Sequence, residues 1–147
     1  MIVYNEIKPF TDDYIELRKK VGFFDLSVDQ AYRSLNNALR VFCAYDGERL
    51  AGMGRLIGDG AVICYIQDVM VDPEYQGHGI GKNIVKRLID CATSMVMPGT
   101  QMYLGLMSVK GTEEFYERLG FIKRPNERFG SGLTLVLKKE GVTETDG

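Results

Sequence analysis

Apolar positions recur with two different periods along the chain, and this predicts a mixture of helices and strands. The helical period is clearest in the stretches that begin near Thr11, Ser27 and Ile80. Between the second and third of these, strand-like runs cover residues 41–45, 49–57 and 61–71. The dipeptides Asp-Gly that separate these runs favour tight hairpin turns, so we predict an antiparallel meander.

The helices carry recognisable start and stop signals. Thr11 is placed to cap the first helix, and Gly22 is placed to end it. Ser27 and Gln30 have the spacing of a capping box for the second helix. The third helix is the longest, because its apolar positions recur as far as Met95.

Shorter elements complete an α+β pattern. We expect a strand over 1–8, a strand over 101–108, a short helix over 112–119, and a last strand pair at 121–122 and 133–137. The hairpins come early and helices are mixed among the strands, so the predicted class is α+β with a mostly antiparallel sheet. Residues 1–139 are expected to form a single domain, followed by a frayed, disordered tail over 140–147.

Composition and charge narrow the class of protein. Of 147 residues, 45% are hydrophobic and 26% charged, which is typical of a globular domain. The 18 basic and 20 acidic residues are spread along the chain, so we expect no nucleic-acid partner. No apolar run reaches the roughly 18 residues of a membrane helix, and no basic leader is evident, so we expect no membrane partner and a cytoplasmic location. The single histidine, His78, and three dispersed cysteines predict reduced thiols and no metal site.

A glycine-rich run lies between the third predicted strand and the long helix. It reads Gln76, Gly77, His78, Gly79, Ile80, Gly81, Lys82. Glycines there expose backbone amides at a helix N-terminus, where the amides and the helix dipole bind phosphate. The alternative is a glycine turn that only lets the strand and helix pack closely. The run does not fit a dinucleotide fingerprint, because Lys82 stands where the third glycine is required. It does not fit a Walker A loop either, because Gln76 stands where the first glycine is required.

Two blocks of the sequence resemble one known family. Gln76, Gly79 and Gly81 match the Q/R-x-x-G-x-G/A signature of the GNAT (Gcn5-related) N-acetyltransferases. The block from Phe115 to Phe121 is similar to the FYxxxGF ending of that family. The resemblance covers residues 66–89 and 101–121, whereas residues 1–40 are similar only in general layout.

The resemblance implies a fold and a donor site. It implies a GNAT-like mixed, mostly antiparallel sheet of six to seven strands with flanking helices and splayed central strands. Acetyl-CoA, as co-substrate, would lie between those splayed strands, with its pyrophosphate held by the amides of Gln76–Lys82. The pantetheine would run beside the backbone of Val69, Met70 and Val71, like an added strand.

Tyr116 and Asp68 are the candidate catalytic residues. Tyr116 occupies the position of the family's usual general acid, and a phenol with a pKa near 10 is protonated at pH 7. The alternative is that it belongs to an aromatic pair in the core. Asp68 is a carboxylate inside an apolar strand, expected on the same face as Ile66 and Met70. It could bind or deprotonate an ammonium acceptor, or it could simply bond to nearby loop amides.

These patterns predict an acetyl-CoA-dependent N-acetyltransferase that acts directly on the primary amine of a small molecule. An amino sugar, a polyamine and an arylalkylamine are the acceptor types considered, and an acidic residue at Asp68 is similar to the glucosamine-phosphate branch of the family. Two alternatives stay open, a peptide or protein N-acetyltransferase and a non-catalytic CoA-binding sensor. A homodimer that pairs through the exposed edge of a terminal strand is also expected.

Overall fold

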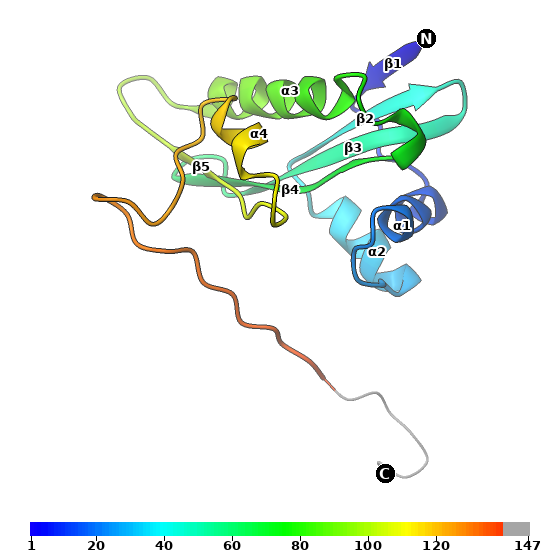
Figure 1. Ribbon diagram of the computed structural model, residues 1–147. Coiled ribbons are helices and arrows are strands. Elements are labelled where there is room, and N and C mark those ends of the chain that lie inside the picture. The colour runs from blue at the N-terminus through cyan, green and yellow to red at the C-terminus, as the bar shows by residue number, and fades with distance from the viewer. Residues whose placement is uncertain (140–147) are drawn as a thin grey trace. The chain divides into compact units, whose positions relative to one another are not determined.

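In the computed structural model, which describes residues 1–139, a five-stranded sheet lies at the centre of the fold (Figure 1). The strands follow each other across the sheet in chain order: β1 (Ile2–Asn5), β2 (Arg40–Asp46), β3 (Arg49–Gly58), β4 (Ile63–Val71) and β5 (Tyr103–Gly105). The first three pairings are antiparallel, and β4 with β5 is parallel. The sheet is therefore mixed and mostly antiparallel, as the sequence predicts.

The described residues divide into two units. Met1–Met107 holds the sheet and its flanking helices, and the part from Ser108 onward holds the short helix α4 (Glu113–Glu117). That residues 1–139 form a single domain stays a prediction. The predicted tail, 140–147, lies outside the described residues. No helix within residues 1–139 has the length and apolar character needed to cross a membrane.

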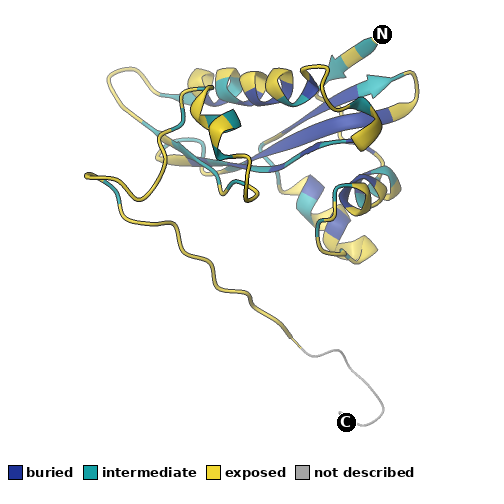
Figure 2. Cartoon of the chain, viewed as in Figure 1, coloured by how far each residue is buried: buried dark blue, intermediate teal, exposed yellow. Residues whose placement is uncertain are grey.

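Helices cover both faces of the sheet in the first unit. α1 (Thr11–Lys20) and α2 (Val28–Asn36) lie on one face, and α3 (Ile80–Met95) lies on the other (Figure 1). Figure 2 shows that burial is concentrated in the middle strands and on the sides of the helices that face them. Side chains from α1, α2 and the strands share one hydrophobic core, which includes Tyr14, Leu17, Ala31, Leu35, Val41, Cys43, Met53 and Met70.

Local capping signals are partly reproduced. The capping box is confirmed, because the Gln30 amide donates to Ser27 Oγ at 3.0 Å and the Ser27 amide donates to Gln30 Oε1. The predicted cap at Thr11 is wrong: Thr11 is the first helical residue, and Phe10 precedes it without a side-chain cap. Packing of Tyr14 and Leu17 against the sheet holds this helix in place of a cap.

Two glycines of β3 let α3 approach the sheet closely. A Cβ atom at Gly52 would lie 2.9 Å from Ile80 Cγ2 and 3.0 Å from the carbonyl oxygen of Met70. A Cβ atom at Gly54 would lie 2.8 Å from Leu88 Cδ1. The first residue of α3 is therefore pressed against the strands, which fixes the preceding loop beside the end of β4.

β4 contains a bulge at Asp68. Met53 pairs with Met70 and Arg55 pairs with Gln67, so β4 uses one residue more than β3 between these pairs. Asp68 has φ 55°, a left-handed conformation that is uncommon for a non-glycine residue.

The bulge changes which side chains share a face of the sheet. Ile66 pairs with Leu56 and Met70 pairs with Met53, and positions 53 and 56 of a regular strand point to opposite faces. Met70 lies in the core with Tyr14, on the face covered by α1. The expectation that Asp68 shares a face with both Ile66 and Met70 is therefore wrong, because it shares one only with Met70.

β4 extends well beyond its pairing with β5, and the splay of these two strands stays a prediction. They pair at only three positions, the last of which is Tyr65 with Gly105. β4 continues to Val71, so residues 66–71 have no strand partner on that edge within the described chain. The strand predicted over 101–108 is correspondingly reduced to Tyr103–Gly105.

The predicted last strand pair is not found in residues 1–139, which contain five strands rather than six or seven. Residues 121–122 and 133–137 have no strand structure. Leu133, Leu135 and Leu137 alternate along the chain as in a strand, yet each is more than 80% exposed. Alternating leucines form an apolar face that another part of a protein could cover. A strand also requires a neighbouring strand edge to which its backbone N–H and C=O groups can hydrogen-bond.

Asp72 fixes the junction between β4 and the glycine loop. It is 1% exposed and accepts a hydrogen bond from the Glu74 amide at 3.0 Å, in the 3₁₀ turn η1 (Pro73–Tyr75). It also forms ion pairs with Lys20 of α1 at 3.1 Å and Arg49 of β3 at 3.0 Å. Burial by itself would raise the pKa of Asp72, but these hydrogen bonds and cations outweigh burial and hold that pKa below its usual value.

We expect Gly52→Ala to lower the free energy of unfolding by about 1–3 kcal/mol, because the added methyl group collides with Ile80 and the Met70 carbonyl. The matched control is Gly130→Ala, whose methyl group meets nothing within 4 Å and whose change should stay within about 0.5 kcal/mol. Urea unfolding followed by circular dichroism measures both. Equal stability of the two variants would contradict the close packing of α3.

We expect the stabilisation by Asp72 to depend on pH. Its folded pKa lies below the unfolded value of about 4, so its contribution is complete above pH 4 and is lost as the pH falls through the folded pKa. Asp72→Asn should cost about 1–3 kcal/mol at pH 7, and this difference from the unmodified protein should shrink at pH 3. Urea unfolding at both pH values measures it, with the exposed Asp90→Asn as control. A difference that is the same at both pH values would contradict this assignment.

Candidate functional site

The loop before α3 leaves backbone amides available at a helix N-terminus. Gly77 and Gly79 have φ 84° and 77°, which glycine adopts readily. Gly79 is the N-cap residue of α3, and no side chain caps this end of the helix. The first hydrogen bond within α3 runs from the Asn83 amide to the Gly79 carbonyl at 3.0 Å. The amides of residues 80–82 are therefore not used by the helix. The first turn of α3 also contains no acidic residue that would repel an anion.

The surroundings of this loop are open. A Cβ atom at Gly77 or Gly79 would meet no atom within 4 Å, so the space that a side chain would fill is free. Ile80 is 2% exposed and anchors the loop, whereas His78 and Lys82 are exposed. The loop therefore combines a fixed backbone with accessible amides.

Gln76 shapes the loop through its side chain. Its Nε2 atom donates to the carbonyl oxygen of Val71 at 3.3 Å, which ties the loop to the last residue of β4. The free edge of β4 at Val69–Val71 thus leads directly to the exposed amides. An extended chain with a phosphate at one end fits such an arrangement, as an added strand that ends at a helix N-terminus.

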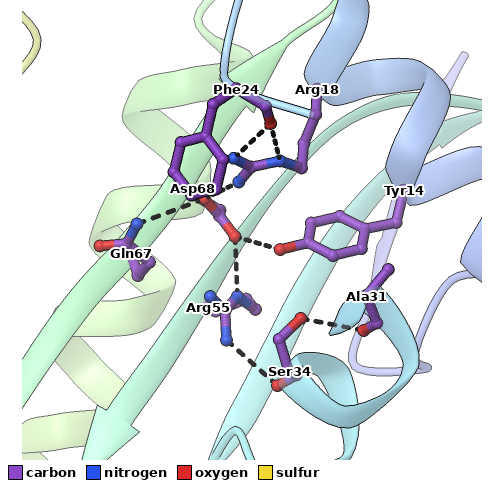
Figure 3. A network of polar contacts seen from close by, with 8 residues as sticks. All are labelled: Tyr14, Arg18, Phe24, Ala31, Ser34, Arg55, Gln67 and Asp68. Carbon is purple, nitrogen blue, oxygen red and sulfur yellow. Dashed lines mark hydrogen bonds and ion pairs between the residues drawn. The ribbon is translucent and has the colours of Figure 1, made fainter. Parts of the chain in front are cut away.

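Asp68 lies at the centre of a buried polar network (Figure 3). Its side chain has no exposed surface, and Oδ1 accepts from Arg18 Nη1 at 2.7 Å and from Gln67 Nε2 at 3.4 Å. Oδ2 accepts from Arg55 Nε at 2.9 Å and from the Tyr14 hydroxyl group. Burial, and then the charge of Asp68, raise the pKa of Tyr14, so this phenol stays protonated and can donate.

The network leaves Asp68 little capacity for a substrate. An ionised carboxylate has about four acceptor positions, and four hydrogen bonds are already made. The expectation that Asp68 binds or deprotonates the acceptor amine stays a prediction, and this geometry favours a positioning role instead. The alternative expectation named loop amides as its partners, but the hydrogen bonds of this carboxylate come from side chains of α1, β3 and β4.

The two arginines tie α1, α2 and the sheet together. Arg18 Nε and Nη2 donate to the carbonyl oxygen of Phe24, and its guanidinium carbon lies 4.7 Å from the centre of the Phe24 ring. Arg55 Nη1 donates to the carbonyl oxygen of Ser34 at 3.1 Å. Within the described residues, Asp68 is the one carboxylate in ion-pair contact with either arginine. The network therefore carries a net positive charge.

Sequence reasoning missed Arg18, Arg55, Gln67 and Asp72. A signal for the arginines was present, since each stands in an otherwise apolar face or run, as Asp68 does. Nothing in the spacing of the sequence indicates that Arg18, Arg55 and Asp68 meet, because they lie on three different elements, α1, β3 and β4.

Tyr116 lies in the second unit, on α4. Its ring packs edge-to-face against Phe115, with centroids 4.9 Å apart, and against Phe121 at 5.9 Å. The Phe121 amide donates to the Tyr116 carbonyl oxygen at 3.2 Å, so the block folds back on itself. Burial raises the pKa of Tyr116, which keeps the phenol protonated at neutral pH. Both the aromatic packing and the protonation required of a general acid are therefore present, and the catalytic role stays a prediction.

Residues 1–139 contain no cluster of three His, Cys, Asp or Glu side chains that could hold a metal ion.

Comparisons with known proteins add independent information. A family model described as "Acetyltransferase (GNAT) domain" matches residues 37–123, which is more than half of the chain. "GCN5-related N-acetyltransferase 2, chloroplastic" from Arabidopsis thaliana is 36% identical over 85 residues, covering 54% of this chain and 31% of that protein. "Glucosamine 6-phosphate N-acetyltransferase" from Trypanosoma brucei brucei is 34% identical over 95 residues, covering 60% of each chain. The chain spans about a third of the length of the curated relative named first here.

Solved structures with the same fold agree with this match. A Staphylococcus aureus protein of unknown function, described as "Probable Acetyltransferase", superposes with a TM-score of 0.83 at 29% identity, over 93% of this chain and 100% of that one. Glucosamine-6-phosphate N-acetyltransferase from Arabidopsis thaliana superposes with a TM-score of 0.64 at 18% identity, over 95% and 98% of the two chains, which shows the fold alone. Together with the glycine loop and the unpaired edge of β4, the family match establishes that this chain belongs to the GNAT acetyltransferase family.

Proposed function

We propose that the protein is an acetyl-CoA-dependent N-acetyltransferase that transfers an acetyl group directly to the primary amine of a small molecule. One observation carries the proposal: the unpaired edge of β4 ends at the open N-terminus of α3. This edge and these amides match the two parts of a CoA molecule, an extended pantetheine and a pyrophosphate.

The residues that would hold acetyl-CoA follow from this match. Of the predicted run Gln76–Lys82, the amides of Gly77 to Lys82 would bind the pyrophosphate, because the Gln76 amide donates to the Pro73 carbonyl oxygen at 3.5 Å. Lys82 would add an exposed positive charge. The backbone of Val69, Met70 and Val71 would take the pantetheine as an added strand. The bound donor supplies a thioester carbonyl as the electrophile.

The transfer needs one nucleophile and one acid. The neutral amine nitrogen of the acceptor would form the new C–N bond while the C–S bond to CoA breaks. Tyr116 would give its phenolic proton to the departing sulfur, the surplus proton on nitrogen would leave to water, and the Tyr116 phenolate would then regain a proton from water. The products are then an N-acetylated amine and free CoA, so atoms and charge balance.

Two relatives named for different acceptors bear on the class of acceptor. One relative is named for glucosamine 6-phosphate, and another, from Glycine max, is named "Histone acetyltransferase TAP1". An amino sugar is therefore our first candidate, with polyamines and arylalkylamines next, and a peptide or protein acceptor as the alternative. A CoA-binding sensor without turnover is disfavoured by the phenol retained at Tyr116.

We also propose a cytoplasmic homodimer. The three cysteines within the described residues are unpaired, which fits a reducing compartment. Leu133, Leu135 and Leu137 expose an apolar row that a second copy could cover. Light scattering should therefore give about twice the 16.5 kDa mass of one chain, and a mass of one chain at working concentration contradicts the dimer.

We expect Tyr116→Phe to lower kcat by about 100-fold, because the general acid is lost, while the affinity for acetyl-CoA stays nearly unchanged. Free-thiol release from acetyl-CoA measures turnover, with amino-sugar phosphates, polyamines, arylalkylamines, amino acids and short peptides as acceptors. Thermal stabilisation by CoA measures binding separately. The control is Tyr32→Phe, the same change at an exposed tyrosine of α2.

Each outcome of this experiment has a distinct meaning. Unchanged turnover in Tyr116→Phe removes Tyr116 from the mechanism. Stabilisation by CoA without thiol release for any acceptor favours the sensor. Absence of stabilisation by CoA contradicts the donor site itself.

A further inference from the structure

Gln67 lies between the buried network and the free edge of β4. It pairs with Arg55 across β3 and β4, so both side chains stand on the face covered by α1 and α2. It is half-buried, and it comes two positions after Tyr65, the last residue of β4 that pairs with β5. Val69, where the proposed donor edge begins, is two positions further on.

The network fixes the orientation of the Gln67 amide. An ionised carboxylate can only accept hydrogen bonds, so Asp68 requires the amide NH₂ group of Gln67 to face it. The Nε2 atom accordingly donates to Asp68 Oδ1 at 3.4 Å. The carbonyl oxygen is turned to the other side, and Figure 3 shows it pointing away from Asp68 and Arg55.

This carbonyl oxygen is available to a ligand. It accepts no hydrogen bond from the residues that the structure describes, and no side-chain oxygen or nitrogen buried among them lacks a partner. The oxygen is therefore accessible, held in direction by a charged neighbour, and placed on the strand that carries the proposed donor edge.

We propose that Gln67 orients the acceptor, its carbonyl oxygen accepting a hydrogen bond from the acceptor's amine N–H, and that Asp68 is a positioning residue that acts through Gln67. This inference rests on the proposed function. In this role Asp68, whose carboxylate already accepts four hydrogen bonds, needs no contact with the substrate.

A neutral oxygen at this place suits the chemistry of the nucleophile. Only the uncharged amine has the lone pair that attacks a thioester. A carboxylate next to the amine would stabilise the ammonium form, whereas an amide oxygen binds N–H without that strong preference. The network beside Gln67 contains Tyr14 and Arg18 from α1, Arg55 from β3 and Asp68 from β4, and α2 contributes the Ser34 carbonyl. Tyr65, two positions earlier in β4, is a further titratable group on the same face as Gln67, and it is uncharged when protonated. Their net positive charge also favours the uncharged amine.

Gln67→Met tests the hydrogen bond, because it keeps the length of the side chain and removes the carbonyl oxygen. We expect the KM for the acceptor to rise about tenfold while the KM for acetyl-CoA changes less than about twofold. The matched control is Gln101→Met, the same change at an exposed glutamine, which should leave both constants unchanged. Initial rates of thiol release, with the best acceptor of the panel above, give these constants.

Gln67→Glu tests the same contact through pH. A carboxylate at position 67 would hold the ammonium form of the acceptor, so the acidic limb of the kcat profile should move to higher pH by about one unit. A side chain that only fills space would leave this limb where it is. This variant decides the question if Gln67→Met melts at a clearly lower temperature than the unmodified protein.

Asp68→Asn tests the positioning role. If Asp68 acts through Gln67, this change raises the acceptor KM in the unmodified protein and has little further effect in the Gln67→Met background. Equal increases in both backgrounds contradict the coupling.

The failures of this inference and of the proposed function are distinguishable. Thiol release by the unmodified protein, together with an unchanged acceptor KM in Gln67→Met and an unmoved pH limb in Gln67→Glu, overturns the role of Gln67 alone. Absence of thiol release with every amine of the panel contradicts the proposed function, and this inference with it.

Discussion

The buried carboxylate of Asp68 is the constraint on which the central part of the structure depends. It lies at a residue with φ 55°, a conformation that costs a non-glycine residue about 1–3 kcal/mol. Ion pairs with Arg18 and Arg55, and a hydrogen bond from Tyr14, hold it there. Because those partners come from α1 and β3, the bulge in β4 and the packing of the helices on the sheet require each other.

Different contacts fix the unpaired edge of β4 and the face of β4 that α1 and α2 cover. On the side of the proposed donor site, the glycines of β3 bring α3 against the sheet, and Asp72 ties the following turn to α1 and β3. The unpaired strand edge and the loop amides are thereby fixed end to end. On the face covered by α1 and α2, the network around Asp68 sets the direction of Gln67. The proposed function, direct transfer between two bound molecules, requires a rigid donor site and an oriented acceptor contact.

Features set by neighbours in the chain could be predicted from the sequence, and features set by distant contacts could not. The capping box at Ser27, the helix Ile80–Met95 and the early hairpins depend on local spacing, and all are present. The face of Asp68 was predicted wrongly because period-two counting assumes a strand without a bulge, and this bulge is held by side chains of α1. The last strand pair was predicted from short apolar segments, although a strand also needs a partner edge.

The central claim is that acetyl-CoA lies along the free edge of β4 with its pyrophosphate at the start of α3. A titration of the ¹⁵N-labelled protein with CoA, followed through its backbone amide resonances, tests this most directly. The account predicts that the amides of Gly77–Lys82 and Val69–Val71 shift together and saturate, while those of β1 at the far side of the sheet stay in place. Saturating shifts confined to other segments, or none at all, would contradict it.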